Sequence, residues 1–267
     1  ITGTGYQIDR VTTFDANTGR YSVVGSPVQN AGFDQLGTSA LVYGYDQSVL
    51  YDPNGVAGAA RFKNPAQLLQ TELVAGQGYF SAFSGDVNGL IEFTGTPNYG
   101  TVNVNLAFTD HAPAEETPYE GFTLVANPFA HSISYTSLMS GNSGANINGS
   151  IYLWDDNNSE TVRGDNADYL VVNAMGNTDS RNNGLSKWDG NIRSGQGFFV
   201  QATSATSISF DASMLGSTNS DGGFFRQDIE NQNVLPEKLV LTDGETNSAA
   251  IVGFADDAEE GVDQQYD

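Results

Sequence analysis

Apolar residues recur at every second position along much of the chain. In the segment 101–108, Thr-Val-Asn-Val-Asn-Leu-Ala-Phe, the apolar side chains at even-numbered positions share one face of an extended strand. The two asparagines share the opposite face, so we expect a half-buried strand here. Runs of similar character lie at 21–25, 40–45, 79–83, 90–94, 122–126, 150–154, 169–172, 197–202, 207–210, 238–241 and 250–254.

Short segments rich in glycine, asparagine and proline separate these runs. Examples are Ala-Asn-Thr-Gly at 16–19 and Asp-Pro-Asn-Gly at 52–55, which supply the positive or preset φ angles of tight turns. Many short strands joined in this way are typical of antiparallel β-sandwiches, and we predict an all-β fold of jelly-roll-like type. The one segment that favours a helix is 65–73, which begins with a proline after Asn64, a candidate N-cap.

The chain contains an internal duplication. Four blocks recur in the same order, and the second copy is longer between its second and third blocks, so we place an insertion within 155–190. The clearest match is Gly-Gln-Gly-Tyr-Phe at 76–80 with Gly-Gln-Gly-Phe-Phe at 195–199. The matched blocks are 21–28 with 122–129, 42–46 with 151–155, 76–82 with 195–202, and 90–93 with 207–210.

The duplication predicts two tandem β-sandwich domains. We expect the first repeat at 1–112 and the second at 119–215, joined by a proline-containing acidic linker at 111–118. The remaining segment, 224–267, is predicted to form a hairpin of 238–241 against 250–254 with Asp-Gly at its turn. It is also consistent with the start of a third module.

The repeated blocks carry a family resemblance. Gly-Gln-Gly-Tyr-Phe at 76–80, Phe-Thr-Gly-Thr-Pro-Asn-Tyr-Gly at 93–100, Leu-Val-Ala-Asn-Pro-Phe at 124–129 and Ile-Tyr-Leu-Trp-Asp at 151–155 resemble the modules that precede the sorting domain in large secreted surface proteins of Bacteroidetes. The tail at 252–267 is similar to the stretch that follows in that family. The resemblance implies export by the type IX secretion system and an extracellular or cell-surface location, often within an adhesin, and it brings no catalytic residues.

Composition excludes several function classes. The chain has 32 acidic against 10 basic residues, a net charge of -22, and no cysteine. This charge opposes binding to nucleic acid or to an anionic lipid surface, because both are held largely by cationic side chains. No run of apolar residues is long enough to span a membrane, and the start Ile-Thr-Gly lacks a basic, apolar leader, so we expect a mature or excised fragment with no membrane insertion.

Motifs for catalysis are absent from the sequence. The two histidines, His111 and His131, stand beside no nucleophile motif or metal-spaced partner, and no Gly-x-Ser-x-Gly, His-Glu-x-x-His or P-loop pattern occurs. We therefore expect no enzymatic activity. An enzyme that uses scattered carboxylates is the least favoured alternative.

Calcium is the candidate cofactor, because carboxylate and amide oxygens are the ligands it prefers. The densest cluster departs from the EF-hand pattern, since its sixth position is Glu160 and its twelfth is Asn166. A site of another type or a solvated acidic loop both fit. The candidate ligands are Asp155, Asp156, Asn157, Asp165 and Asp168.

Other repeated residues favour structural roles. The paired Gly-Gln-Gly segments are expected to set a turn or bulge before a core strand, and Ser26 and Asn127, each before a proline, to end strands through side-chain bonds to nearby backbone. Tyr43 and Tyr45 should share one sheet face, and so should the corresponding pair at 152 and 154.

Trp188 is the candidate ligand-binding residue, as an aromatic in the inserted loop that could stack on a sugar. Packing or loop anchoring is the competing interpretation.

We predict a non-catalytic module of a secreted adhesin or filament-forming protein. Its expected partners are other copies of itself, as a homo-oligomer, or surface glycans. The alternative is a carbohydrate-binding module of a secreted polysaccharide-degrading protein, with Trp188 in contact with sugar.

The charge imbalance predicts that stability depends on ions. Because acidic side chains repel one another in the compact state, added salt or calcium should screen them and raise the melting temperature. Thermal melts with NaCl, CaCl₂ and EDTA measure this effect. A melting temperature that none of the three additions changes would contradict the argument.

Overall fold

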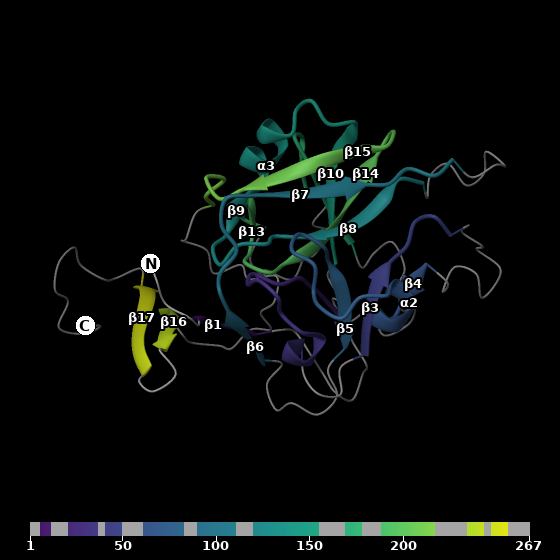
Figure 1. Ribbon diagram of the computed structural model, residues 1–267. Coiled ribbons are helices and arrows are strands. Elements are labelled where there is room, and N and C mark those ends of the chain that lie inside the picture. The colour runs from purple at the N-terminus through teal and green to yellow at the C-terminus, as the bar shows by residue number, and fades with distance from the viewer. Residues whose placement is uncertain are drawn as a thin grey trace, which may run out of the picture.

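The computed structural model describes residues 6–11, 21–36, 41–49, 61–82, 90–110, 120–154, 169–177, 188–216, 234–242 and 247–255. Every strand pair in this part is antiparallel, which confirms the predicted all-β class (Figure 1). None of the helices described is long and apolar enough to cross a membrane.

Two sheets, which we call the inner sheets, have the same strand order. Inner sheet 1 has the order β2-β5-β3-β4, and inner sheet 2 has the order β8-β14-β10-β11-β12, so each strand of the first has a counterpart in the second. Three of the four recurrent sequence blocks occupy these counterparts, and the fourth lies in β6 (Leu90–Gly95) and β15 (Thr206–Asp211) outside the inner sheets. The bounds are β2 (Ser22–Val24), β5 (Tyr79–Ala82), β3 (Leu41–Tyr45), β4 (Phe62–Lys63), β8 (Phe122–Ala126), β14 (Gly197–Ala202), β10 (Ile147–Trp154), β11 (Tyr169–Asn173) and β12 (Gly176–Asn177).

A strand pair, which we call an outer pair, belongs to each inner sheet. Outer pair 1 joins β1 (Tyr6–Val11) to β6 (Leu90–Gly95), and outer pair 2 joins β7 (Thr101–Leu106) to β15 (Thr206–Asp211). β7 thus pairs with the last matched block of the second repeat, although it lies before the boundary expected at residue 112. Strand pairing therefore groups residues 101–106 with the second repeat.

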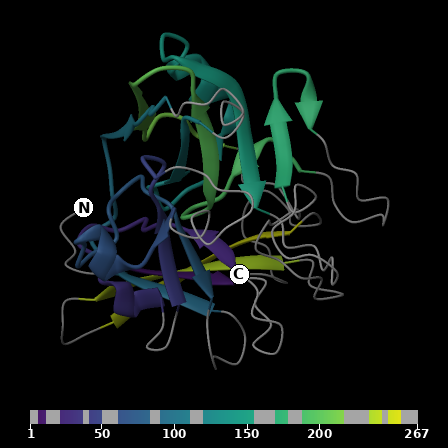
Figure 2. The ribbon, with the colours of Figure 1, turned by 90° about the vertical axis from the view of Figure 1, so that its right-hand side faces the viewer.

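The C-terminal hairpin is confirmed. β16 (Val234–Thr242) pairs along its whole length with β17 (Asn247–Ala255), and Lys238 faces Ile251. The expected turn, Asp243-Gly244, lies outside the described residues. β16 also pairs with β1, so the hairpin extends outer pair 1 into a sheet of order β17-β16-β1-β6 (Figure 2).

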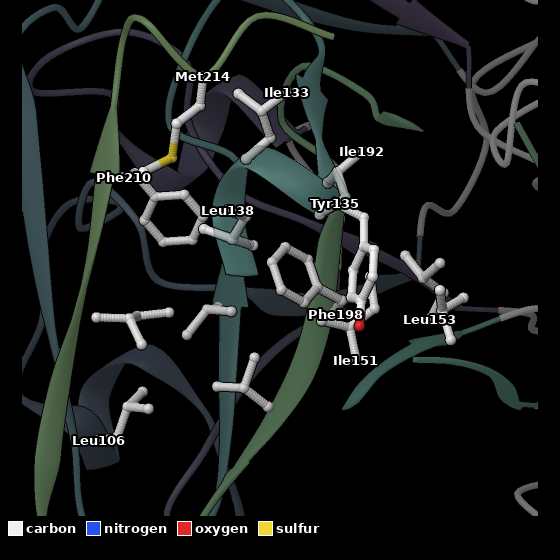
Figure 3. Packing of buried hydrophobic residues seen from close by; sticks show 14 of the residues in the cluster. Leu106, Ile133, Tyr135, Leu138, Ile151, Leu153, Ile192, Phe198, Phe210 and Met214 are labelled. Carbon is white, nitrogen blue, oxygen red and sulfur yellow. The ribbon is translucent and has the colours of Figure 1, made fainter. Parts of the chain in front are cut away.

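A hydrophobic core fills the space between each inner sheet and its outer pair. In the second repeat, Phe198 and Ile151 of inner sheet 2 pack against Ile208 and Phe210 of β15 (Figure 3). Tyr135 and Leu138 of α3 join the same core. In the first repeat, the core residues are Val24, Val28, Ala31, Leu36, Val42, Leu73, Tyr79, Ile91 and Phe93.

In the ranges given above, three short helices connect the strands. α2 (Pro65–Leu68) begins at the predicted cap, where Asn64 and Gln67 form a reciprocal capping box, but it ends at Leu69 in a left-handed conformation with a φ of 56°. The predicted helix 65–73 is therefore too long, because the chain turns to bury Leu73 in the core. The pattern did not predict η1 (Phe33–Leu36) or α3 (Tyr135–Gly141), each too short to show a helical period.

Ser26 and Asn127, each before a proline, follow the ends of β2 and β8 and bond to nearby backbone as predicted. Ser26 Oγ accepts a hydrogen bond from the Val28 amide at 3.1 Å, and Asn127 Oδ1 accepts one from the Phe129 amide at 3.0 Å. The Asn127 side-chain nitrogen Nδ2 also lies 2.8 Å from the carbonyl oxygen of His131, shortly before β9 (Ile133–Ser134). It lies 3.1 Å from the carbonyl oxygen of Ile192 in β13 (Asn191–Ile192) and 3.0 Å from that of Arg193, which follows β13. The larger side chain therefore connects three segments of the second repeat.

These contacts predict unequal effects of two equivalent substitutions. Asn127→Ala should lower the free energy of unfolding by about 3 kcal/mol, because it leaves buried carbonyls without a donor, whereas Ser26→Ala should cost about 1 kcal/mol. Urea denaturation of both variants measures the difference. Equal losses would contradict the connecting role of Asn127.

Candidate functional site

The two inner sheets lie back to back, and strands β2, β5 and β14 are buried on both faces. In β2, Val24 points into the core of the first repeat, whereas its neighbour Val23 belongs to a separate cluster shared by both repeats. In β14, Phe198 and Phe199 divide in the same way between the second core and the shared cluster. The contact between the repeats is thus a third hydrophobic core, which we call the interface cluster.

Aromatic rings make up most of the interface cluster. Phe80 and Phe199 lie at its centre with ring centroids 6.1 Å apart, and Phe80 packs edge-on against Trp154 at 5.3 Å. Edge-to-face contacts of this kind contribute about 0.5–1.5 kcal/mol each beyond the area that they bury. The members are Val23, Phe80, Leu124 and Phe199, with Tyr21, Tyr43, Tyr45, Phe62, Phe122, Tyr152, Trp154 and Tyr169 around them.

The predicted sharing of faces is confirmed for both aromatic pairs. Tyr43 and Tyr45 lie together in the interface cluster, as do Tyr152 and Trp154. The Trp154 indole also donates a hydrogen bond to the Tyr21 carbonyl of the first repeat at 2.8 Å. These rings hold the repeats together and are half-buried there.

The Gly-Gln-Gly segments are structural, as predicted. Gly76 and Gly195 each occupy a turn before a core strand with φ angles of 81° and 67°, which glycine adopts without strain. The second glycine allows the sheets to approach, because a Cβ on Gly78 would lie 2.6 Å from the carbonyl oxygen of Val125. The sequence did not indicate that this contact joins the two repeats.

Trp188 packs against the core of the second repeat. It is half-buried, and its ring meets Tyr135 edge-on at a centroid distance of 6.0 Å. Its indole Nε1 is buried and has no hydrogen-bond partner among the residues that the structure describes. Nearby, Arg193 forms an ion pair with Asp189 at 2.9 Å. The geometry agrees with the packing interpretation, and contact with sugar stays a prediction.

The candidate calcium ligands lie outside the described residues. This applies to the whole cluster formed by Asp155, Asp156, Asn157, Asp165 and Asp168. Within the described ranges, no group of three or more histidine or acidic side chains is placed to hold a metal ion. Calcium binding therefore stays a prediction.

Buried polar side chains in the described part serve the fold. Tyr79 Oη donates to Gln70 Oε1 at 2.9 Å and accepts from the Val74 amide at 3.1 Å. Burial raises the pKa of Tyr79 to about 12, and the Val74 hydrogen bond opposes that rise. His131 stacks on Phe129 and its Nδ1 lies 3.0 Å from the Ser132 carbonyl oxygen.

Sequence reasoning missed the interface cluster as a site. One signal was present, because Tyr79-Phe80 and Phe198-Phe199 are adjacent large apolar residues within strands expected to alternate. Such runs indicate a strand buried on both faces.

Comparison with known proteins assigns the family. No curated protein and no solved structure matches the chain significantly. A protein family described as a domain of unknown function, DUF8693, matches residues 2–267, which is nearly the whole chain. The chain therefore belongs to the DUF8693 family.

Proposed function

We propose that the chain is a non-catalytic structural module of a secreted cell-surface protein, of adhesin or filament-forming type. The observation that carries the proposal is the interface cluster, which buries the aromatic faces of both repeats against each other. A hinged pair of domains would keep a smaller, more polar contact. Two repeats that share a core keep a constant orientation, which is the property a spacer or stalk needs.

The resemblance to modules of type IX-secreted surface proteins supports the extracellular setting. A net charge of -22 is compatible with that setting, because external salt and divalent cations screen the repulsion between acidic side chains. Calcium is part of the proposal as a screening or bound ion, and its ligands would come from the acidic segment 155–168. Other copies of the chain or surface glycans are the proposed partners.

The two tryptophans provide a test of the shared core. Trp154 reports on the interface cluster and Trp188 on the core of the second repeat, so the variants Trp154→Phe and Trp188→Phe each leave one fluorescent reporter. Circular dichroism measures how much each substitution changes the overall urea midpoint. After correction for that change, we expect the fluorescence of both tryptophans to give the same midpoint, because the repeats unfold as one unit. A Trp154 transition well before that of Trp188 would show that the repeats separate first and would contradict a stiff module.

Substitutions at Trp188 separate packing from sugar contact. Trp188→Ala should lower the free energy of unfolding by about 2–3 kcal/mol through lost packing. Trp188→Phe should cost less, because the indole N–H has no hydrogen-bond partner in the described part of the chain. Thermal melts measure both effects. On polysaccharide columns we expect no retention that depends on Trp188. Retention of the wild type that Trp188→Ala abolishes would favour the carbohydrate-binding alternative.

A further inference from the structure

The interface between the repeats has approximate two-fold symmetry. Phe80 of the first repeat contacts Trp154 of the second at 5.3 Å, and its counterpart Phe199 contacts Tyr45, the counterpart of Trp154, at 5.0 Å. In such a contact, a residue of the first repeat meets a residue of the second, and the counterparts of these two residues meet in the same way. The contact is isologous, as in a symmetric homodimer.

Ring contacts within each face are repeated as well. Phe80 meets Phe62 at 5.3 Å, and Phe199 meets Tyr169 at 6.1 Å. Further matched pairs are Tyr21–Phe80 with Phe122–Phe199, Tyr45–Phe62 with Trp154–Tyr169, and Tyr21–Tyr43 with Phe122–Tyr152. The two faces are therefore two versions of one surface.

Backbone hydrogen bonds follow the same symmetry. The Gly25 amide donates to the Gly195 carbonyl at 2.8 Å, and the Ala126 amide donates to the Gly76 carbonyl at 2.9 Å. Gly25 and Ala126 are counterparts, and a Cβ on Gly25 would meet the Ala126 Cβ directly, so these residues lie near the two-fold axis. The hydrogen bonds and the ring contacts are therefore related by the same approximate two-fold axis.

We propose that each repeat is a self-complementary docking unit. Its aromatic face takes another copy of the same face as its partner: the other repeat of the same chain when that repeat is in reach, and a repeat of a second chain when its own is displaced. This inference rests on the interface symmetry and not on the proposed function. A stalk could exist without it, because a stalk needs only the contact within one chain.

One difference between the two aromatic faces concerns Trp154 and its counterpart Tyr45. Trp154 donates its indole N–H to the Tyr21 carbonyl across the interface, whereas its counterpart Tyr45 contacts Arg61 of its own repeat at 3.1 Å. The hydrogen bond from Trp154 to Tyr21 therefore stabilises a pair of one first and one second repeat. The short connection also holds the partner repeat at a high effective concentration, so the aromatic faces of two wild-type chains should not pair with each other.

Two glycines allow one face to be blocked at a time. A Cβ at Gly78 would lie 2.6 Å from the Val125 carbonyl oxygen, and a Cβ at Gly197 would lie 2.3 Å from Val23 Cγ1. Each clash is with the other repeat. Gly78→Leu should therefore block the first face and leave the second face intact, and Gly197→Leu should do the reverse. Gly144→Leu is the matched control, because no atom lies within 4 Å of its Cβ position.

The test mixes full-length chains. Native mass spectrometry of Gly78→Leu with ¹⁵N-labelled Gly197→Leu should show a one-to-one heterodimer, in which the free second face of one chain binds the free first face of the other. Each variant alone should show a weaker homodimer through its remaining face. Wild type and Gly144→Leu should form much less dimer than this mixture at the same concentration, and circular dichroism checks that every variant is folded.

Other results would overturn the proposal. Folded leucine variants that stay monomeric both alone and when mixed would show that the face does not dock between chains. If wild type and Gly144→Leu dimerise to the same extent as the mixture of leucine variants, association occurs through another surface. If a leucine variant does not fold, Gly78→Ala and Gly197→Ala repeat the experiment with a smaller clash, and the same outcomes decide it.

Discussion

Burial of both faces of the inner sheets is the constraint on which the rest of the structure depends. Each inner sheet has a core on one side and the interface cluster on the other, so β5 and β14 are buried along almost their whole length. Removal of apolar area from water contributes about 25 cal/mol per Å². A sheet with one aromatic face exposed would forgo that contribution, and neither repeat is therefore complete without the other.

Close approach of the sheets requires small residues at the contact. Gly78 and Gly197 lie where any side chain would enter the opposite repeat, and Gly25 meets Ala126 at the two-fold axis. Phe80 and Phe199 then fill the space beside this small-residue line. Large and small side chains alternate across the interface as they do inside a domain, which is how packing reaches the density of a protein interior.

The outer strands show how the duplicated units are delimited. β1 and β7 play the same part, since each pairs antiparallel with the last strand of its own repeat, at Ile8 with Phe93 and at Val102 with Phe210. The segment at 96–100 between β6 and β7 is held at the interface, where the Asn98 side chain donates to the carbonyls of Ser26 and Pro128. The covalent connection between the repeats is thus part of the contact between them.

The sequence by itself determined the β class, the positions of most of the longer strands, the C-terminal hairpin and the duplication, because period-two patterns and turn residues act over a few neighbours. It did not predict β1 or the two-residue strands β4, β9, β12 and β13. It also indicated structural roles for Gly76, Asn127 and their counterparts, since those roles depend on local backbone conformation. Only the tertiary structure decided what the second face of each strand meets. The alternation that places Tyr43 with Tyr45 cannot distinguish solvent from another sheet, and pairing of β7 with β15 joins residues about a hundred positions apart. Such contacts arise from the packing of whole sheets, and no local pattern encodes them.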